Sequence, residues 1–511
     1  MHEIPPPMTF PELFPSPAGP LRAVLAASAF ALLPALLSAQ APVPAEGADD
    51  AIEDAVVLID VTSQHGDWFT PWQAGPIVRG TGSGFLIRRG LIITNAHVVS
   101  DARQVLIKRN GNPTPAFASV AFIAHDADLA LLQVSDPAFD EGVEPLPLGD
   151  LPSLRTRVRT YGYPAGGEQI SRTEGVVSRV EFVTYLHSGA DAHLAIQTDS
   201  AINPGNSGGP VVQNGKVVGV AFQTSTRLND VGYFIPTPVI KRFLRDIADG
   251  SYQGYAELGL VTSDLFNASY RAHLGMPLGK TGVVVDRVLP ASSAFGIVRE
   301  QDVVTAIDGV PVTLDGSIRF HGYQVGMEQL VEDKLTGESV ELSLVRDRAA
   351  LQVKIPLRPL GFAERMRNRF NVMPDYVVYA GLVFIELDQE YLLTFGNFWE
   401  NGDKSLLYAH FFRTIEQPDG EMDAPIVLSR VLPHAINSAY RPYANSLVTT
   451  VNGRPVKSLA GLRAALDAGK DRSQVIMLDG GREIVLDRAE ADAAHPRILE
   501  TYGIRSDRRL E

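Results

Sequence analysis

The segment Asn203-Pro204-Gly205-Asn206-Ser207-Gly208-Gly209-Pro210 decides the fold class of this chain. Glycines on both sides of Ser207 permit unusual backbone angles, so the hydroxyl can be presented while neighbouring backbone N–H groups converge on one point. A glycine-rich hairpin turn would explain the same sequence. The segment also fits G-x-S-x-G, but a nucleophile elbow needs a helix directly after the serine, and Val211-Val212 followed by Asn214-Gly215 predicts a strand and a turn. The segment therefore favours an exposed serine nucleophile in a β-rich fold.

Two weaker signals lie upstream of this serine. His97 closes the apolar strand pattern of Leu91-Ile92-Ile93-Thr94-Asn95-Ala96-His97, and Asp128 begins the apolar run Asp128-Leu129-Ala130-Leu131-Leu132. Alone, a histidine at a strand end is more often structural, and an aspartate can simply start a strand. Together they give the order histidine, aspartate, serine of chymotrypsin-like triads. We expect His97 to be the general base, Asp128 to orient it and Ser207 to attack; Asp126 is the alternative acid, and otherwise a solvated turn residue.

Composition excludes several other classes of protein. The 511 residues contain no cysteine, which removes thiolate catalysis, a disulfide framework and cysteine-ligated metals. The 45 Lys and Arg against 59 Asp and Glu give a net charge of −14, so we expect no nucleic-acid partner. No phosphate loop or zinc motif occurs, and His125 and His193 lack partners at metal-ligand spacing. We expect no cofactor and no metal, and a surface position for both histidines.

The rest of the chain divides into a β-rich region and an internal repeat. Short apolar runs broken by Gly, Pro and Asn over residues 51–250 are typical of an all-β sandwich or barrel, with one helix expected at residues 237–249. Beyond it, Arg287-Val288-Leu289-Pro290 returns as Arg430-Val431-Leu432-Pro433, and residues 302–312 return as 446–456. Two motifs in the same order at nearly the same offset indicate tandem copies of one domain, with a boundary near residues 358–375.

Residues 1–41 have the pattern of a leader. Seven prolines occupy the first 20 residues, and the apolar stretch from Ala23 to Leu37 is too short for a regular membrane span but matches the core of a secretory signal. Ala39-Gln40-Ala41 resembles a signal peptidase site, although Pro42 directly after it is unfavourable. We expect a periplasmic or secreted protein with no stable membrane span after cleavage, and a membrane-anchored one if the segment is not cleaved.

The motifs of the β-rich region resemble those of the HtrA/Do-like (Deg) family of serine proteases. The similarity rests on the segments around His97, Asp128 and Ser207 and extends through Gly162-Tyr163-Pro164, Gly175-Val176-Val177-Ser178, Gln197-Thr198-Asp199 and Tyr233-Phe234-Ile235-Pro236. The resemblance implies a mainly β chain: a chymotrypsin-like double β-barrel protease domain at 42–250, then two PDZ-like α+β domains at 255–360 and 361–511. It also implies an ATP-independent serine endopeptidase that degrades unfolded or damaged proteins. The alternative is a chaperone or peptide-sensing scaffold with a latent protease site; an esterase has nothing in the sequence to favour it.

Further site residues follow from this resemblance. Backbone N–H groups at Gly205, Asn206 and Ser207, chiefly the first and the last, are expected to form the oxyanion hole. Ala201, six residues before the serine, would lie at the base of the primary specificity pocket. The pocket would be edged by Ala221, Phe222 and Gln223. Because Ala201 carries no charge, we expect cleavage after small or medium apolar residues rather than after Arg or Lys.

Each C-terminal repeat resembles a PDZ domain, in which a peptide adds a strand to a sheet edge and its carboxylate meets backbone N–H groups. Leu258-Gly259-Leu260, preceded by Glu257, is the expected carboxylate loop of the first copy, and Ala380-Gly381-Leu382 that of the second. The second copy, with its insert from Asp388 to Glu421, resembles that of the plant-type Deg subgroup, in which this domain is implicated in assembly. We therefore expect the first copy, rather than the second, to bind peptides.

Trp68, Phe69 and Trp72 form an aromatic cluster in a loop-like segment near the start of the β-rich region. They could simply cap a barrel. HtrA relatives use aromatic residues near the N-terminus to form trimers, so we expect a subunit interface here and a homo-oligomer built from trimers. The other expected partners are unfolded protein or peptide substrates.

Overall fold

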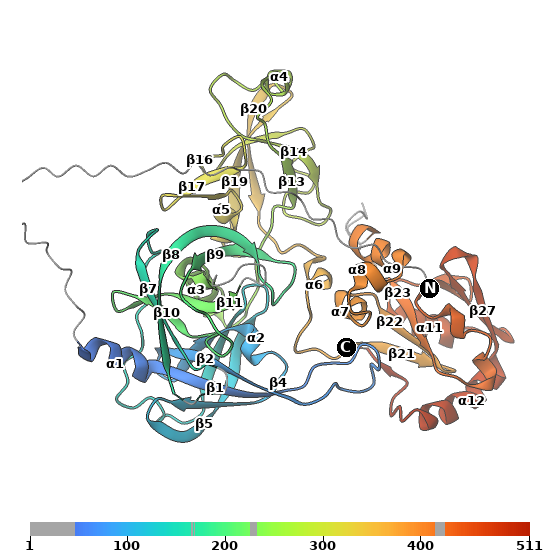
Figure 1. The fold of residues 1–511 in the computed structure, drawn as a ribbon. Coiled ribbons are helices and arrows are strands. Elements are labelled where there is room, and N and C mark those ends of the chain that lie inside the picture. The colour runs from blue at the N-terminus through green and yellow to red at the C-terminus, as the bar shows by residue number, and fades with distance from the viewer. Residues whose placement is uncertain (1–45, 165–166, 168, 225–231, 414–424, 511) are drawn as a thin grey trace, which may run out of the picture. The chain divides into compact units, whose positions relative to one another are not determined.

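The computed structural model describes residues 46–164, 167, 169–224, 232–413 and 425–510 (Figure 1). The expected leader, its cleavage site and part of the insert, residues 414–424, lie outside these ranges. Within them, no helix combines the length and the apolar character needed to cross a membrane.

Two closed antiparallel barrels follow helix α1 (Glu46–Ala55), and they confirm the β-barrel expectation. The first, blue in Figure 1, has the strand order β1-β2-β3-β6-β5-β4. Its strands are β1 (Val56–Ser63), β2 (Val78–Arg88), β3 (Leu91–Thr94), β4 (Ala102–Arg109), β5 (Asn112–Ala124) and β6 (Leu129–Val134). The second, green in Figure 1, has the order β10-β11-β12-β9-β8-β7. Its strands are β7 (Arg157–Gly162), β8 (Ser171–Thr184), β9 (Ala192–Thr198), β10 (Pro210–Gln213), β11 (Lys216–Thr224) and β12 (Gly232–Pro236). Inward-facing apolar side chains of both barrels join one core.

Helix α3 (Thr237–Asp246) closes the double barrel where a helix is expected. A single 3₁₀ turn, Ile247–Asp249, extends it, and Gly250 ends it in the left-handed conformation at φ 94°. Arg242 of α3 is 1% exposed. Its guanidinium donates to Asp246 (2.8 Å) and to the carbonyl of Gly254 (2.7 Å). This buried cation therefore ties the end of the double barrel to the chain that leads into the next domain.

The first PDZ-like domain is built on a sheet of order β13-β14-β15-β19-β20, with β16 paired to β15. Its strands are β13 (Leu260–Ser263), β14 (Val283–Val288), β15 (Val303–Ile307), β16 (Val310–Pro311), β19 (Ser339–Arg346) and β20 (Ala349–Pro356). A separate hairpin consists of β17 (Ser317–Phe320) and β18 (Tyr323–Gly326), and the helices are α4 (Ala268–His273) and α5 (Gln329–Glu332). Strand β13 lies at one edge of the sheet, which is where a PDZ domain accepts an added strand.

The second PDZ-like domain has a larger sheet, of order β27-β26-β24-β23-β22-β21-β28, with β25 paired to β24. Its strands are β21 (Tyr376–Tyr379), β22 (Leu382–Glu386), β23 (Ile426–Val431), β24 (Ser446–Val451), β25 (Arg454–Pro455), β26 (Ser473–Leu478), β27 (Glu483–Asp487) and β28 (Arg508–Arg509). Helix α6 (Ala363–Met366) precedes this sheet. The insert contributes α7 (Gln389–Leu393), α8 (Phe398–Asn401) and α9 (Lys404–Tyr408), and the later helices are α11 (Leu459–Asp467) and α12 (Arg488–Thr501).

The internal repeat of the sequence is confirmed as a structural repeat. In both copies the Arg-Val-Leu-Pro motif overlaps the end of a strand, β14 or β23, that pairs with the strand of the second motif, β15 or β24. Each second motif then turns through two residues with positive φ. These are Asp308 and Gly309 (46° and 78°) in one copy and Asn452 and Gly453 (50° and 74°) in the other. Asp-Gly and Asn-Gly suit such tight turns because both residues tolerate left-handed backbone angles.

Two of the three aromatic residues in the segment before β2, Trp68 and Trp72, pack against this chain itself. Trp68 is 4% exposed, and its indole N–H donates to Asp388 at 2.9 Å. Trp72 packs edge-on against Tyr376, with ring centroids 6.4 Å apart. The expectation that Trp68 forms a subunit interface is wrong, because this side chain belongs to an apolar cluster of the second PDZ-like domain. Phe69 is the exposed member, at 53%.

Candidate active site

The fold brings His97 and Asp128 together. His97 lies in the short helix α2 (Ala96–Val99) directly after β3, and Asp128 lies in the turn before β6, the strand paired with β3. His97 Nδ1 is 2.8 Å from Asp128 Oδ2, and the His97 backbone N–H donates to Asp128 Oδ1 at 2.9 Å. The Asn95 side-chain amide donates to the Asp128 carbonyl at 2.9 Å. Both carboxylate oxygens of Asp128 are thus bonded to His97, and Asn95 holds the backbone of Asp128, which together fix the orientation of the imidazole.

Electrostatics couples the protonation of His97 to the carboxylate of Asp128. Burial acts to raise the pKa of Asp128, but the charge and hydrogen bonds of His97 outweigh it and hold the pKa of Asp128 below its usual value. Burial likewise acts to lower the pKa of His97, but the Asp128 carboxylate prevails and the pKa of His97 is raised. Asp128 is 1% exposed, whereas one third of the His97 side chain reaches solvent. The site therefore holds an ionised aspartate beside an accessible base.

The alternative acid, Asp126, has different partners. Its Oδ1 accepts the Tyr252 hydroxyl at 2.6 Å and the Ala127 amide at 2.9 Å, and its Oδ2 lies 3.9 Å from Arg367. At 4% exposure it is not the solvated turn residue expected from the sequence. Its carboxylate is committed to residues of a later segment, so Asp128 alone of the two aspartates pairs with His97.

Ser207 lies where the two barrels meet. Its carbonyl accepts the Ser83 amide at 2.8 Å, and Ser83 Oγ donates to the Gly205 carbonyl at 2.7 Å. A Cβ atom at Gly208 would lie 2.0 Å from the Ser83 carbonyl oxygen and 2.3 Å from the Thr94 hydroxyl. Only glycine permits this approach, which brings the Ser207 loop against the strand that leads into His97. Strand β10 follows directly, as expected, so the nucleophile-elbow alternative does not apply.

The backbone groups around Ser207 suit acyl transfer, but in the described part of the chain its hydroxyl is bonded to the Phe222 carbonyl and not to His97. Ser207 Oγ donates to the Phe222 carbonyl at 3.4 Å, and the described residues give it no hydrogen bond to His97. Among these residues, the amides of Gly205 and Ser207 donate to no acceptor, whereas the Asn206 amide donates to Asn203 at 2.9 Å. The expectation of Asn206 as an oxyanion donor is therefore wrong, because its N–H is already used.

The expected substrate pocket is only partly described. Ala221 and Phe222 are buried in β11, at 0% and 4% exposure. Gln223 continues that strand, but its side chain and residues 225–231 lie outside the described residues. Ala201 is exposed in the loop before Ser207. The assignment of the pocket stays a prediction.

Sequence reasoning missed a second histidine beside His97. His187, in the loop between β8 and β9, has its ring centroid 6.2 Å from that of His97, and its Nε2 lies 2.9 Å from His125 Nδ1. Burial lowers the pKa of His187 to about 4, so the ring is neutral. The sequence offers no signal for this position, because it depends on how a loop folds over a neighbouring barrel. In the part of the chain that the structure describes, no group of three or more His, Asp or Glu is placed to hold a metal ion.

His193 is not the surface residue expected from the sequence. It is 3% exposed, and its Nδ1 lies 3.1 Å from Glu332 of helix α5 in the first PDZ-like domain. His125, the other histidine expected at the surface, is half-buried. Both are covered by segments that lie far away in the sequence.

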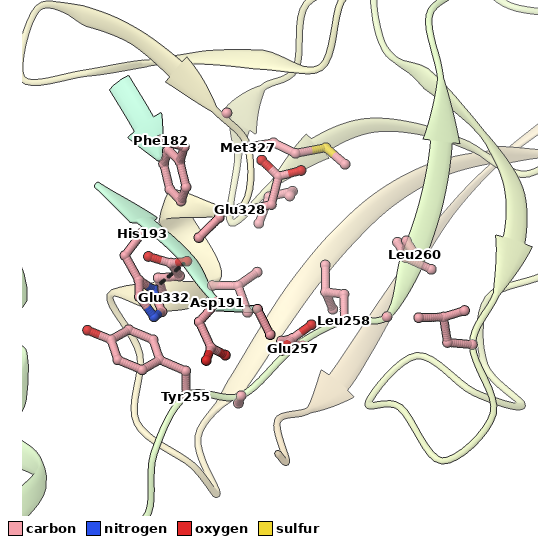
Figure 2. Close-up of a pocket in the computed structure, with 18 residues that line it drawn as sticks. Phe182, Asp191, His193, Tyr255, Glu257, Leu258, Leu260, Met327, Glu328 and Glu332 are labelled. Carbon is pink, nitrogen blue, oxygen red and sulfur yellow. Dashed lines mark hydrogen bonds and ion pairs between the residues drawn. The ribbon is translucent and has the colours of Figure 1, made fainter. Parts of the chain in front are cut away.

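Leu258, Gly259 and Leu260 line a cavity of about 470 Å³ that extends to Met327 and helix α5 (Figure 2). Gly259 has φ 68°, and a Cβ there would lie 2.2 Å from that of Ser292, so the loop requires glycine. Glu257 also lines the cavity, and burial raises the pKa of its carboxyl. Within the described residues, β13 pairs only with β14, which leaves its outer edge open to an added strand.

The corresponding edge of the second PDZ-like domain is occupied. Strand β22, the counterpart of β13, pairs with β23 on one side and with β21 on the other, and β21 pairs in turn with β28 near the C-terminal end of the chain. In the loop between β21 and β22, the Ala380 carbonyl accepts the Asn437 amide at 2.8 Å, and the Ala380 N–H donates to His495 at 3.2 Å. One N–H of the loop that could meet a peptide carboxylate, that of Ala380, is thus bonded to a side chain of this domain.

Two barrels with a His–Asp pair beside a glycine-framed serine, joined to PDZ-like sheets, define a chymotrypsin-like serine protease with PDZ domains. The family model of trypsin-like peptidase domains matches residues 82–220, and that of PDZ domains matches residues 366–510.

Curated relatives extend this match over most of the chain. Protease Do-like 4, mitochondrial, from Arabidopsis thaliana is 34% identical over 460 residues, which cover 90% of this chain and 85% of the relative. Protease Do-like 2, chloroplastic, from the same plant is 36% identical over 470 residues, covering 91% and 76%. Among solved structures, an HtrA-type protease, AlgW with a decapeptide, aligns with 61% of this chain and 98% of its own, at 22% identity and a TM-score of 0.46. The chain belongs to the HtrA/Do-like (Deg) family of serine proteases and is a serine endopeptidase.

Proposed function

We propose that the protein degrades unfolded or damaged proteins without ATP, using His97, Asp128 and Ser207 as its catalytic triad. The observation that carries this proposal is the His97–Asp128 pair, joined through two hydrogen bonds of 2.8 and 2.9 Å, in a fold that packs the Ser207 loop against the same strand ends. Peptide hydrolysis is favourable in water, so the chemistry needs no coupled energy source.

In the proposed mechanism, Ser207 Oγ leaves the Phe222 carbonyl by rotation about its Cα–Cβ bond and donates to His97 Nε2. The new O–C bond forms at the scissile carbonyl while His97 takes the hydroxyl proton, and Asp128 stabilises the imidazolium. The amides of Gly205 and Ser207 bind the oxyanion; losing one such donor typically costs about 10²–10³ in rate. His97 then gives its proton to the leaving amine as the C–N bond breaks, and a water molecule hydrolyses the acyl-enzyme by the same steps.

The same proposal assigns a role to each domain. The protease domain occupies residues 42–250, and the PDZ-like domains occupy 255–360 and 361–511. The first PDZ-like domain captures peptides at Leu258-Gly259-Leu260, supported by the open edge of β13 and the adjoining cavity. The second serves assembly, consistent with its occupied edge. Cleavage is expected after small or medium apolar residues, and strong cleavage after Arg by the purified protein would overturn this preference.

We propose further that residues 1–41 direct export and are removed in a periplasmic or secreted protein, which assembles as a trimer or a multiple of trimers. The two plant relatives are named as a mitochondrial and a chloroplastic protease. Light scattering coupled to size-exclusion chromatography tests the assembly, and a monomer would contradict it. N-terminal sequencing of the exported protein tests the cleavage site.

Degradation of casein in the absence of ATP tests the proposed activity. The wild type is expected to degrade casein, and Ser207→Ala, which removes only the hydroxyl, is expected to abolish degradation while the fold remains. If neither protein degrades casein and both suppress aggregation of an unfolded client, the protein is a chaperone with a latent site and the proposed function is wrong.

A further inference from the structure

Residues 367–371, which lie between helix α6 and the first strand of the second PDZ-like sheet, contact the active-site region of the protease domain. We refer to this segment as the interdomain strap. Arg367 makes a two-pronged contact with Asp191, with both N–H···O distances 2.6 Å. Asn371 exchanges two hydrogen bonds with Asp101, which lies just beyond the helix that carries His97. The strap is thus bonded to two loops of the protease domain that flank the proposed triad.

Between these anchors, the strap fixes the loop that connects β8 and β9. The Asn368 backbone N–H donates to the Ser188 carbonyl at 2.8 Å, and its side-chain amide donates to the His187 carbonyl at 3.0 Å. Phe370 stacks on the His187 ring, with centroids 4.2 Å apart and planes inclined by 16°. The strap therefore holds both the backbone of this loop and the side chain of His187.

The same loop contacts the active site at two points. The His187 ring lies beside His97, at 6.2 Å between centroids. Tyr185 packs on Phe222 at 4.6 Å, and the Phe222 carbonyl accepts the Ser207 hydroxyl. One loop thus borders both the general base and the nucleophile, and the strap packs against that loop.

The strap is held equally firmly by the second PDZ-like domain. The Arg369 backbone N–H donates to Glu390 at 2.7 Å, and its guanidinium donates to Asp388 at 3.2 Å. The Gln389 amide donates to the Asn368 side chain at 2.7 Å. All three partners lie at the start of helix α7, in the insert of the second domain. The strap is therefore fixed between this insert and the catalytic domain.

We propose that the interdomain strap is a positioning element of the active site. Through Phe370 and Asn368 it holds the β8–β9 loop so that His187 packs beside His97 and Tyr185 packs against Phe222. Phe370 is a positioning residue, because it touches neither Ser207 nor His97 and acts through His187. The inference rests on the proposed function, in which His97 is the general base.

The electrostatics of His97 gives this role a measurable signature. The groups that face His97 or its partners are Asp128, Ser100, His187 with His125 behind it, and, further out, Asp101, Asp126 and Arg367. Burial of the imidazole acts to lower the pKa of His97, whereas the Asp128 carboxylate acts to raise it and prevails. If the neutral His187 ring is no longer held in place, water enters beside His97. The effect of burial on the pKa of His97 then weakens, and this pKa rises. The acid limb of the activity profile then moves to higher pH.

The experiment compares the full-length wild type with Phe370→Ala on a short fluorogenic peptide between pH 5 and 9. The proposal predicts that kcat falls about tenfold, the size of a modest loss of positioning. KM is expected to stay within about twofold, and the acid limb to move to higher pH. Phe370→Trp, which keeps an aromatic face for His187, restores most of kcat. Phe266→Ala, at an exposed phenylalanine of the first PDZ-like domain, is the matched control and leaves both constants unchanged.

A second variant keeps the proposal testable if Phe370→Ala fails to fold. Arg367→Lys retains the charge but loses the two-pronged contact with Asp191, and it is expected to lower kcat and shift the acid limb in the same direction. An unchanged or higher kcat in the folded variants would overturn the proposal. So would a rise in KM alone, or a loss of kcat with an unmoved acid limb. If the wild type hydrolyses nothing, or His97→Ala remains active, the proposed function itself has failed.

Discussion

His97 owes its protonation behaviour to a single carboxylate. Because Asp128 raises the pKa of His97 above its ordinary value of 6.5, the imidazole remains protonated to a higher pH than a free histidine. A protonated imidazole cannot take the Ser207 proton, so activity is lost as the pH falls through this raised pKa. We expect the acid limb of kcat/KM for peptide hydrolysis to have its midpoint above pH 6.5. A midpoint clearly below 6.5 would contradict the pairing.

The two neighbouring aspartates are expected to have different roles: Asp128 orients the proposed base, and Asp126 supports the structure. Asp128→Asn keeps the shape of the side chain but favours the wrong imidazole tautomer, and about 10⁴-fold of kcat is expected to be lost. Asp126→Asn removes the charge near Arg367 and weakens the acceptor for Tyr252, so it lowers the unfolding temperature but retains most activity. Parallel kinetics and calorimetry check both variants. Equal losses of activity would show that the acid is wrongly assigned.

The close approach of the Ser207 loop to β2 and β3 depends on glycine. Gly208 and Gly215 share a positive φ, 86° and 75°, but a Cβ at Gly208 collides with Ser83 and Thr94, while Gly215 has nothing within 4 Å. Both alanine variants store backbone strain of about 1–3 kcal/mol. Gly208→Ala adds overpacking of about 1–3 kcal/mol. We expect scanning calorimetry to show a larger loss of stability for Gly208→Ala than for Gly215→Ala; equal losses would contradict the packing described.

At the scale of helices and strands, the sequence predicts most of the elements that the structure contains. The β-rich region, helix α3 and the two-copy repeat follow from local patterns: apolar periodicity, Gly and Asn at turns, and repeated Asp-Gly or Asn-Gly. The double barrel follows only from the family resemblance. The segment near residues 358–375 was predictable only as a boundary. Its bonds to the protease domain involve partners more than 170 residues away, such as Arg367 to Asp191, and no local pattern encodes them.

Across the whole molecule, the main corrections come from contacts between domains. Trp68 meets Asp388 across 320 residues, and His193 meets Glu332 across 139. The sequence alone predicts a subunit interface at Trp68 and a surface position for His193, because sequence patterns report burial within an element and not burial by a distant one. The residues of the proposed triad were predictable for the opposite reason, since the motifs around them and their order along the chain are visible in the sequence itself.

His65 gives the docking of the second PDZ-like domain its own pH dependence. Hydrogen bonds to Asp101 and then Glu390 raise the pKa of His65 to about 9. The protonated form stabilises the docked state fully below the unfolded value of about 6.5, and this contribution is lost as the pH rises through 9. We expect the unfolding temperature to fall between pH 7 and pH 10 by more in the wild type than in His65→Gln. Equal falls in the two proteins would contradict the ion pair.

The whole account depends on one nucleophile. Fluorophosphonates react with a serine only when a neighbouring base and an oxyanion site activate it, so labelling followed by peptide mapping is the most direct test. The account predicts a single labelled residue, Ser207, no label in Ser207→Ala, and labelling slowed by orders of magnitude in His97→Ala. Label on another residue, or casein degradation that persists in Ser207→Ala, would contradict it.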